Sequence, residues 1–473
     1  MRTIFFFDDW RLQNRDNMVR RLGKPTWIPE ATLEDDLTEG TWNYPTVWYD
    51  KEADQWRALY CGAAPHSLYP DKPRTRFLRS QVLMYAQSPD GIHWEKPDLT
   101  KETKSIGRLR PNQVFWADIP LHPEGRGGAR IGGGPVYYDE REPDPKRKLK
   151  YLYCYVSEDG KSEQRLATSP DGIHWRVEDI IWGKRDKLDS PFGLFYNKHR
   201  DCYVIINRLN EGDRRVAFIQ TKDFQTFSRP DLIIHPDPED PPLVQFYGMP
   251  VFSYEDIYIG LLWRLHTDPA EEIGIVKTFG HMDCSLTYSY TGWVFNRCFH
   301  QAFIPLNKRG EHGGGCVYTA SMVCKDDKIR FYSGGSKAEH FRNQELNDAA
   351  LMLHTLRKDG FCYLESYATR GKIITKALIF KKDDLRLNVC VPYGSIRVQV
   401  LDQSAKPIEG FTYQDAISFT GDEVEHRPGW KSGKRLNQLA GKPVYLEIEI
   451  TEGAIYAIRG EFDPVGEGLI VQE

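Results

Sequence analysis

Two acidic residues, Asp189 and Glu311, stand just before apolar runs at distant points of the 473-residue sequence. Asp189 lies in the turn-like stretch Leu-Asp-Ser-Pro, and Glu311 lies in the glycine-rich stretch Arg-Gly-Glu-His-Gly-Gly-Gly, where a ligand can approach the backbone closely. Cleavage of a glycosidic bond needs two carboxyl groups, one as proton donor and one as base or nucleophile. The two residues are therefore the candidate catalytic pair, with a strand cap and a solvated loop acid as their structural alternatives.

A third candidate acid follows the apolar run Phe5–Phe7, where Asp8 and Asp9 are adjacent. Neighbouring residues of a strand point to opposite faces, so at most one of the two carboxylates faces a shared site. We expect Asp9 to face the site and the other carboxylate to pair with an arginine such as Arg20 or Arg21.

Polar and aromatic side chains at the ends of other apolar runs are the candidate substrate-binding groups. Aromatic rings stack on the apolar faces of sugar rings, and cationic or amide side chains donate hydrogen bonds to hydroxyl groups. These candidates are Trp42, Asn43, Tyr44, Arg130, Arg208, Gln245, Tyr247, Trp263, Arg264, His266, His312 and His340.

An internal repeat supplies the elements that would position these side chains. The segments Ala86–Trp94 and Ala167–Trp175 both contain Ser-Pro-Asp-Gly-Ile-His-Trp, and Pro-Asp-Gly between apolar runs indicates a tight turn. The aspartate and histidine of each turn are expected to be structural: Asp90, His93, Asp171 and His174.

Each cycle of the repeat reads as strand, turn, strand, loop, strand and turn, and five cycles cover roughly residues 40 to 362. Radial repetition of small antiparallel sheets protects sheet edges, so the sequence predicts an all-β fold with a five-bladed β-propeller over residues 1–362. A solenoid would show a shorter and more regular period. Alternating apolar and polar residues over 363–473 predict a following β-sandwich that supports the propeller.

The order of propeller and sandwich resembles the invertase and levanase type glycoside hydrolases of family 32, whose propeller is shared with family 43. The likeness rests on the paired turns, on inner strands such as Pro-Thr-Val-Trp-Tyr-Asp from Pro45, and on the C-terminal tract Gly-Ser-Ile-Arg-Val-Gln-Val-Leu-Asp from Gly394. It implies sugar chemistry at the centre of the propeller. The family's catalytic Asp, Asp and Glu are not all reproduced: Tyr44 and a glycine stand at the first two positions, and Asp189 stands at the third.

Tyr44 opens an alternative chemistry. Sialidases use a tyrosine nucleophile, and propeller-type lyases use tyrosine and histidine for proton abstraction beside a uronate. Both classes act on anionic sugars, which arginine side chains would bind. A stacking or hydrogen-bonding tyrosine is the structural alternative.

Composition excludes several other classes. A net charge of −4 argues against a dedicated nucleic-acid or membrane surface, and no segment approaches the roughly 20 apolar residues of a membrane span. Nine scattered cysteines without a Cys-x-x-Cys pair indicate reduced thiols and a cytoplasmic protein, or a secreted one if a signal peptide has been removed. No residue cluster has transition-metal spacing, so no cofactor is expected, with an axial calcium ion as the open alternative.

The sequence thus predicts a glycoside hydrolase that is exo-acting on an oligosaccharide at the centre of the propeller, with carboxylate acid and base chemistry. A lyase or sialidase-like enzyme using Tyr44, a phosphorolytic enzyme, and a non-catalytic carbohydrate-binding protein are the alternatives. Sugar identity, stereochemical outcome and oligomeric state are left open by the sequence.

Overall fold

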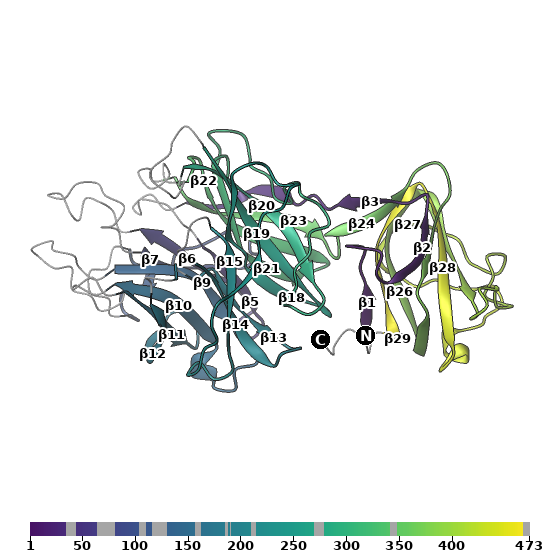
Figure 1. Ribbon diagram of the computed structural model, residues 1–473, viewed down its shortest axis with the longest axis horizontal. Helices are drawn as coiled ribbons and strands as arrows, with labels where there is room; N and C mark the ends of the chain where they lie inside the picture. Colours follow the sequence, from purple (N-terminus) through teal and green to yellow (C-terminus); the bar gives the residue numbers. More distant parts are fainter. Residues whose placement is uncertain are drawn as a thin grey trace, which may run out of the picture.

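The chain folds into two β-rich bodies that lie side by side (Figure 1). The computed structural model describes residues 1–34, 44–63, 81–103, 110–115, 130–156, 162–184, 188–189, 191–209, 214–268, 279–340 and 348–466. Two short 3₁₀ helices, η3 (Pro145–Arg147) and η6 (Leu436–Leu439), interrupt the strands of this part of the chain. None of its helical segments has the length and apolar character needed to cross a bilayer.

Three blades are separate four-stranded antiparallel sheets. Blade 1 contains β5 (Thr46–Asp50), β6 (Gln55–Ala63), β7 (Gln81–Ser88) and β8 (Gln113–Phe115). Blade 2 contains β9 (Arg130–Tyr138), β10 (Leu149–Val156), β11 (Ser162–Ser169) and β12 (Arg176–Lys184). Blade 3 contains β13 (Gly193–Asn197), β14 (Cys202–Arg208), β15 (Val216–Thr221) and β16 (Asp231–Ile234).

Blades 4 and 5 are joined into one sheet by a single parallel bridge between Met282 and Cys316. Blade 4 contains β17 (Val244–Gly248), β18 (Val251–Tyr254), β19 (Ile257–Thr267) and β20 (Gly280–Ser289). Blade 5 contains β21 (Cys316–Lys325), β22 (Lys328–Ser336), β23 (Ala350–Arg357) and, as its outermost strand, β4 (Thr26–Glu34). The all-β fold of a five-bladed propeller followed by a sandwich is therefore confirmed, and an N-terminal strand closes the ring.

The repeated turns have the geometry that their sequence predicts. Gly91 and Gly172 adopt φ values of 74° and 83°, a region in which glycine carries no steric penalty. The Asp90 carboxylate accepts hydrogen bonds from two backbone amides of its turn, and burial opposes but does not prevent a lowered pKa for this group. Asp171 repeats the same contacts in blade 2. These aspartates hold turns, as expected.

The second body is a β-sandwich in which N-terminal and C-terminal strands pair. Its C-terminal strands are β24 (Cys362–Ser366), β25 (Gly371–Thr375), β26 (Leu378–Leu401), β27 (Phe419–His426), β28 (Pro443–Thr451) and β29 (Gly453–Pro464). Three N-terminal strands join them: β1 (Arg2–Ile4) pairs with β29, β2 (Leu12–Asp16) with β25, and β3 (Val19–Leu22) with β24. In Figure 1 these purple strands lie beside the green and yellow ones. Strands β1, β2 and β3 thus belong to this sheet, whereas the sequence predicted that these residues were part of the propeller.

A buried ionic network joins the two bodies. The Arg459 guanidinium of β29 pairs with both oxygens of Asp359, which follows β23, and the two side chains are 2% and 0% exposed. Tyr254 Oη donates to Asp359 Oδ1 at 2.6 Å, and Asn388 Nδ2 donates to Asp359 Oδ2 at 2.9 Å. Because the Asp359 carboxylate has four donors, its charge is balanced despite complete burial.

His354 in β23 makes the stability of the fold depend on pH. Its side chain is buried, its Nδ1 has no hydrogen-bond partner among the described residues, and burial lowers its pKa to about 4. Between pH 6.5 and 4 the unfolded chain therefore binds a proton that the folded chain does not, and stability falls as pH falls.

The free energy of unfolding of the wild type is expected to fall as pH falls from 6.5 to 4, and we expect His354→Leu to make this fall smaller by up to about 3 kcal/mol. Urea unfolding at pH 7 and pH 4.5 measures it, with the exposed His235→Leu as control. The same pH dependence in wild type and His354→Leu would contradict the assignment.

Candidate functional site

The inner strands of the five blades bring distant residues to the propeller axis. Tyr44 lies two residues before β5, and its buried ring stacks on that of Trp263 in β19, with centroids 5.4 Å apart and an interplanar angle of 5°. Phe192 and Tyr318, from blades 3 and 5, meet the Tyr44 ring edge-on at 6.2 and 5.7 Å. Four blades thus contribute rings to one buried group, which we call the axial aromatic cluster.

The rings of the axial aromatic cluster are buried, so they form the base of the candidate site and do not offer an open surface on which a sugar ring could stack. Trp263 is fully buried, and its Nε1 donates to the Thr319 carbonyl at 2.9 Å. Burial and the neighbouring Tyr247 raise the pKa of Tyr44 well above its ordinary value. The Tyr44 phenol therefore stays protonated at neutral pH.

Asp189 and Arg208 form an ion pair beside the axial aromatic cluster. The Arg208 guanidinium donates to the Asp189 carboxylate and lies over the Tyr247 ring at 4.2 Å. Arg208 is buried, while the Asp189 side chain keeps 19% of its surface exposed. Burial alone would lower the pKa of Arg208, but the charge and hydrogen bond of Asp189, together with Tyr247 and Tyr44, outweigh burial and raise the pKa. The pair therefore presents a charged, reachable carboxylate at the axis.

The backbone of Asp189 is fixed from two blades. Its amide donates to the Arg208 carbonyl at 2.9 Å, and its carbonyl accepts from Gln164 and Asn207 side chains, each at 2.9 Å. Such fixed placement is what a catalytic carboxylate requires.

Blade 4 adds Tyr247 and Gln245 to the same region. The Tyr247 hydroxyl lies 3.3 Å from His340 Nε2, and the Gln245 side chain accepts a hydrogen bond from Arg214 at 2.7 Å. All four side chains are buried. The structure therefore brings together the following predicted residues: Tyr44, Asp189, Arg208, Gln245, Tyr247, Trp263 and His340.

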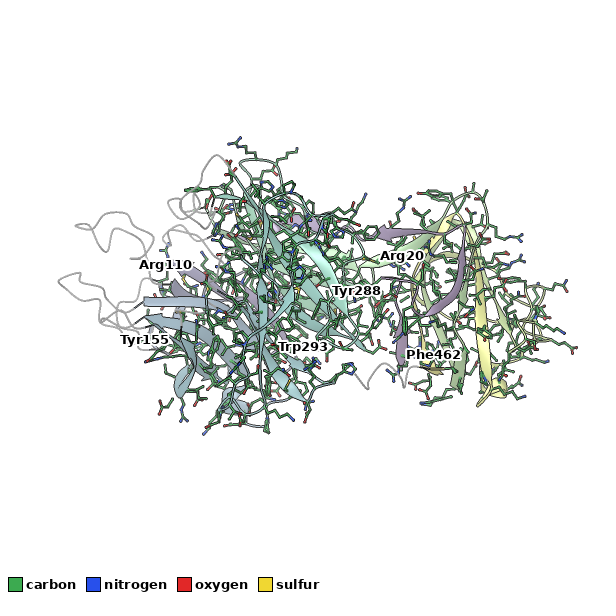
Figure 2. All side chains as sticks on the ribbon, viewed as in Figure 1. Arg20, Arg110, Tyr155, Tyr288, Trp293 and Phe462 are labelled. Carbon is green, nitrogen blue, oxygen red and sulfur yellow. The ribbon has the colours of Figure 1, made fainter. Side chains whose placement is uncertain are left out.

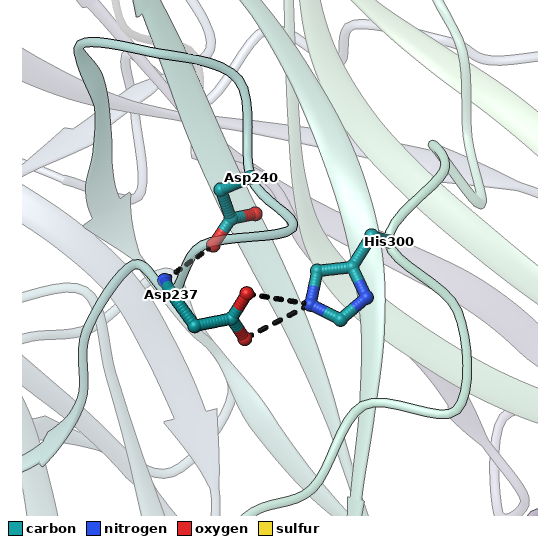
Figure 3. Close-up of side chains that lie close together, drawn as sticks. All are labelled: Asp237, Asp240 and His300. Atoms are coloured by element: carbon teal, nitrogen blue, oxygen red, sulfur yellow. Dashed lines mark hydrogen bonds and ion pairs between the residues drawn. The ribbon is translucent and has the colours of Figure 1, made fainter.

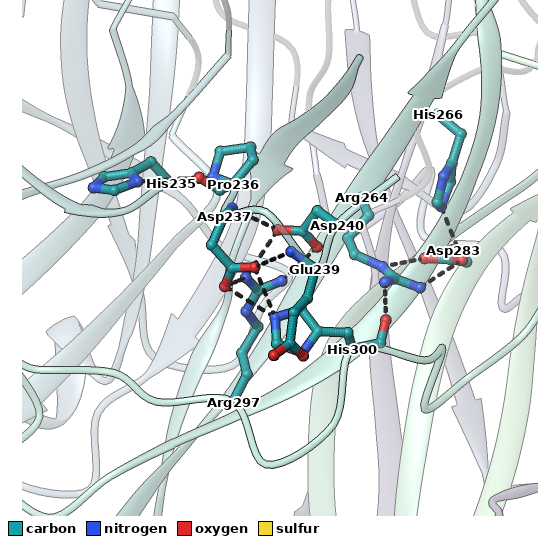
Figure 4. A network of polar contacts seen from close by, with 10 residues as sticks. All are labelled: His235, Pro236, Asp237, Glu239, Asp240, Arg264, His266, Asp283, Arg297 and His300. Carbon is teal, nitrogen blue, oxygen red and sulfur yellow. Dashed lines mark hydrogen bonds and ion pairs between the residues drawn. The ribbon is translucent and has the colours of Figure 1, made fainter. Parts of the chain in front are cut away.

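Arg264 and His266 belong to a different network, which Figure 4 shows. Arg264 binds Asp283 through Nε and Nη2 at 2.8 and 2.9 Å, and His266 Nε2 lies 3.0 Å from the same carboxylate. Although burial opposes it, His266 and Arg264 lower the pKa of Asp283. His266 also stacks on His281 at 4.6 Å. Arg264 and His266 thus both bind Asp283, and their roles in sugar binding stay predictions.

Glu311 and His312 lie on the turn before β21. Glu311 is exposed, and its carboxylate makes no hydrogen bond or ion pair with another residue that the structure describes. His312 Nε2 lies 2.6 Å from the Glu34 carboxylate at the end of β4, and its Nδ1 lies 3.0 Å from the Asp348 carbonyl. Like Asp189, Glu311 therefore precedes an inner strand, but no hydrogen bond or ion pair joins the two residues.

Asp9 does not join the axial residues. Its exposed carboxylate pairs with Arg15 and Arg20 on β2 and β3. The neighbouring Asp8 instead accepts hydrogen bonds from Tyr288 and Tyr290 at 2.8 and 3.0 Å. Figure 2 labels Tyr288 on the propeller side of the junction and Arg20 on the sandwich side. Asp9 thus makes the arginine pairing that was expected of its neighbour, and Asp8 contacts the propeller through Tyr288 and Tyr290. The prediction that Asp9 faces the site is wrong because both acids lie in a bend between β1 and β2, where strand alternation does not apply.

Three predicted positions give no side-chain geometry. Trp42 and Asn43 lie outside the described residues, and Arg130 is described only as the backbone start of β9. Their roles stay predictions.

Figure 3 shows a group of possible metal ligands that was not predicted from the sequence. One ligand atom each of Asp237, Asp240 and His300 lies within 4.8 Å of the others. Arg297, however, pairs with both aspartates, with Nη1 to Asp240 Oδ1 at 2.6 Å. Although burial opposes it, His300 and Arg297 lower the pKa of Asp237 to about 2. A guanidinium thus already balances these carboxylates, and the group acts as an ion-pair network. The acidic tract Asp237–Asp240 is the sequence signal that could have indicated this group.

A hollow lies at the junction of the two bodies. It is a cavity of about 480 Å³ whose lining includes Lys24, Arg357, Tyr363 and Tyr456. The Arg357 guanidinium lies 4.9 Å from the centre of the Tyr456 ring. This junction cavity is the alternative place for a ligand.

Comparison with known proteins gives similarities of fold. No family model and no curated protein matches the chain. Solved structures with similar folds include an N-acetylgalactosamine deacetylase from F. plautii in complex with blood group B trisaccharide, at 13% identity and a TM-score of 0.46 over 72% of this chain and 95% of that one. A β-1,2-mannobiose phosphorylase from Listeria innocua is similar at 12% identity and a TM-score of 0.46, over 73% of this chain and 98% of that one. The catalytic domain of a Coprinopsis cinerea GH62 α-L-arabinofuranosidase is similar at 12% identity and a TM-score of 0.43, over 71% of this chain and 97% of that one. Similarities at these scores assign no activity to this chain.

Proposed function

We propose that this protein is a glycoside hydrolase, exo-acting on an oligosaccharide at the propeller axis. The observation that carries the proposal is the Asp189 carboxylate, which is partly exposed, held by the buried Arg208 and set beside the axial aromatic cluster. A fixed carboxylate in a partly dry site is the group that glycoside cleavage requires.

In this proposal Asp189 is the base or nucleophile. The positive charge of Arg208 stabilises the ionised carboxylate, which suits attack or water activation rather than proton donation. Glu311, which is exposed on the turn before β21 of blade 5, is the proposed proton donor. The reaction uses these two carboxyl groups and needs no cofactor.

The charges around the site favour a neutral sugar. Arg208, which lies over the Tyr247 ring beside the axial aromatic cluster, already carries the Asp189 carboxylate as its partner. An anionic sugar that binds Arg208 would have to displace this carboxylate. A neutral oligosaccharide is therefore the proposed substrate class.

Tyr44 has a supporting role in this proposal, and we expect Tyr44→Phe to keep the turnover rate within about fivefold of wild type. The phenol is buried and protonated, so removing its hydroxyl leaves the stacked ring in place. Steady-state kinetics measures the rate. Loss of about a hundredfold or more would instead favour the sialidase-like or lyase alternative, in which the phenol itself reacts.

A glycan panel tests the proposed function. Neutral and uronate-containing oligosaccharides are incubated with the protein, with and without phosphate, and products are separated by chromatography. Phosphate-independent release of a monosaccharide from a neutral chain end is expected. Unsaturated products would favour a lyase, phosphate-dependent sugar phosphates would favour a phosphorylase, and tight binding without products would favour a carbohydrate-binding protein.

A further inference from the structure

Two cysteines from different parts of the fold lie in contact at the junction of the two bodies. Cys298 Sγ and Cys362 Sγ are 3.1 Å apart, although 64 residues separate them in the sequence. Cys298 is partly exposed and Cys362 is buried. A disulfide bond is about 2.05 Å long, so the sulfur atoms have to approach by only about 1 Å to form one.

The two thiols are attached to elements of different bodies. Cys298 lies between two bridges, Tyr288 to Asn296 and Cys284 to Ile304, that tie its segment to β20 of blade 4. Cys362 is the first residue of β24, where it pairs with Leu22 in the sheet of the sandwich. A bond between them would therefore link blade 4 to the sandwich and enclose all of β21, β22 and β23.

The packing around the pair holds the sulfur atoms in place. Cys362 belongs to the main propeller core, and Cys298 packs against that core. Phe361, next to Cys362, lies 6.0 Å from Phe7 and 6.4 Å from Phe303, measured between ring centres. The contact is thus between two residues anchored by their surroundings.

We propose that Cys298 and Cys362 form a reversible disulfide that staples the propeller to the sandwich under oxidising conditions. With glutathione disulfide as oxidant, the partly exposed Cys298 thiolate attacks one glutathione sulfur and breaks its sulfur–sulfur bond, which releases one glutathione thiolate. The buried Cys362 then attacks Cys298 Sγ and releases the second glutathione. The two protein thiols lose two electrons and two protons, and two molecules of reduced glutathione result.

Cys298 is the first to react because of its exposure. Burial raises the pKa of Cys362 well above its usual value, so the first attack falls to Cys298, and Cys362 reacts second because its sulfur lies in contact with Cys298 Sγ. The enclosed loop is long, and a disulfide across a long loop restricts the unfolded chain strongly. We expect the oxidised protein to melt up to about 5 °C above the reduced protein.

The experiment treats the full chain with glutathione disulfide and then with dithiothreitol. Peptide mass spectrometry without reduction should find Cys298 linked to Cys362, and thermal melting should show the rise and its reversal. Cys298→Ser should lose both results, whereas the matched control Cys324→Ser, at an exposed cysteine, should keep them.

Two outcomes would overturn the proposal. One is recovery of both residues as thiols, or of Cys298 only as its glutathione adduct. The other is a Cys298–Cys362 link that leaves the melting temperature of the oxidised protein unchanged, which would refute a stapling role.

Discussion

Replacing Asp189 with Asn is expected to lower the turnover rate at least about a hundredfold. The side chain keeps its size and its place beside Arg208 but loses the negative charge that the proposed base or nucleophile needs. The substrate KM should change far less than kcat, because the floor formed by the axial aromatic cluster is left intact. Steady-state kinetics on the oligosaccharide identified by the glycan panel measures both.

Loss of a buried charge also affects stability, so a matched control is needed. Asp139 is fully buried and pairs with Lys150 at 2.7 Å, but it lies in the turn between β9 and β10, at the opposite strand ends from Asp189. Asp139→Asn should cost similar stability and keep the turnover rate per folded molecule. Equal rate losses in the two variants would show that Asp189 acts on folding and not on the reaction.

Replacing Asp359 with Asn is expected to lower the free energy of unfolding by about 3–5 kcal/mol. The change removes the closest partner of the buried Arg459 charge and leaves it only the longer ion pair with Glu255, at 3.5 Å. Asp359 has a φ of 63°, which asparagine tolerates well, so the backbone contributes little to the loss. Urea unfolding of both forms measures the difference.

Asp327→Asn is the matched control for this prediction. Asp327 also has a positive φ, 55°, but its side chain is 63% exposed and its ion pair with Lys358 is long, at 3.6 Å. Exposed pairs contribute little, so this variant should stay within about 1 kcal/mol of wild type. A loss for Asp359→Asn as small as for Asp327→Asn would refute a central role for the junction network.

The blades could be predicted from the sequence because their signals are local. Ser-Pro-Asp-Gly turns and the apolar runs around them repeat within short distances, and each hairpin needs only neighbouring residues to pair. The strand that closes blade 5 was not predicted, because β4 pairs with β23 across more than 300 residues of sequence. The same reason explains why β1, β2 and β3 were assigned to the propeller.

The sequence predicted which residues lie near the propeller axis, but it did not predict which side chains they bind. Topology alone places Tyr44, Asp189 and Tyr247 near one axis, and the structure brings them together. Which carboxylate each arginine selects depends on side-chain geometry, so the pairs of Arg208 with Asp189 and Arg264 with Asp283 had no sequence signal. The pair of Arg208 with Asp189 is the reason for proposing a neutral sugar as the substrate.

The most direct measurement is a crystal structure of the Asp189→Asn protein soaked with the oligosaccharide that wild type cleaves. The account predicts electron density for the terminal sugar at the axis, with its scissile bond next to the side chain of residue 189. A sugar bound in the junction cavity, or at any place away from Asp189 and Arg208, would contradict it.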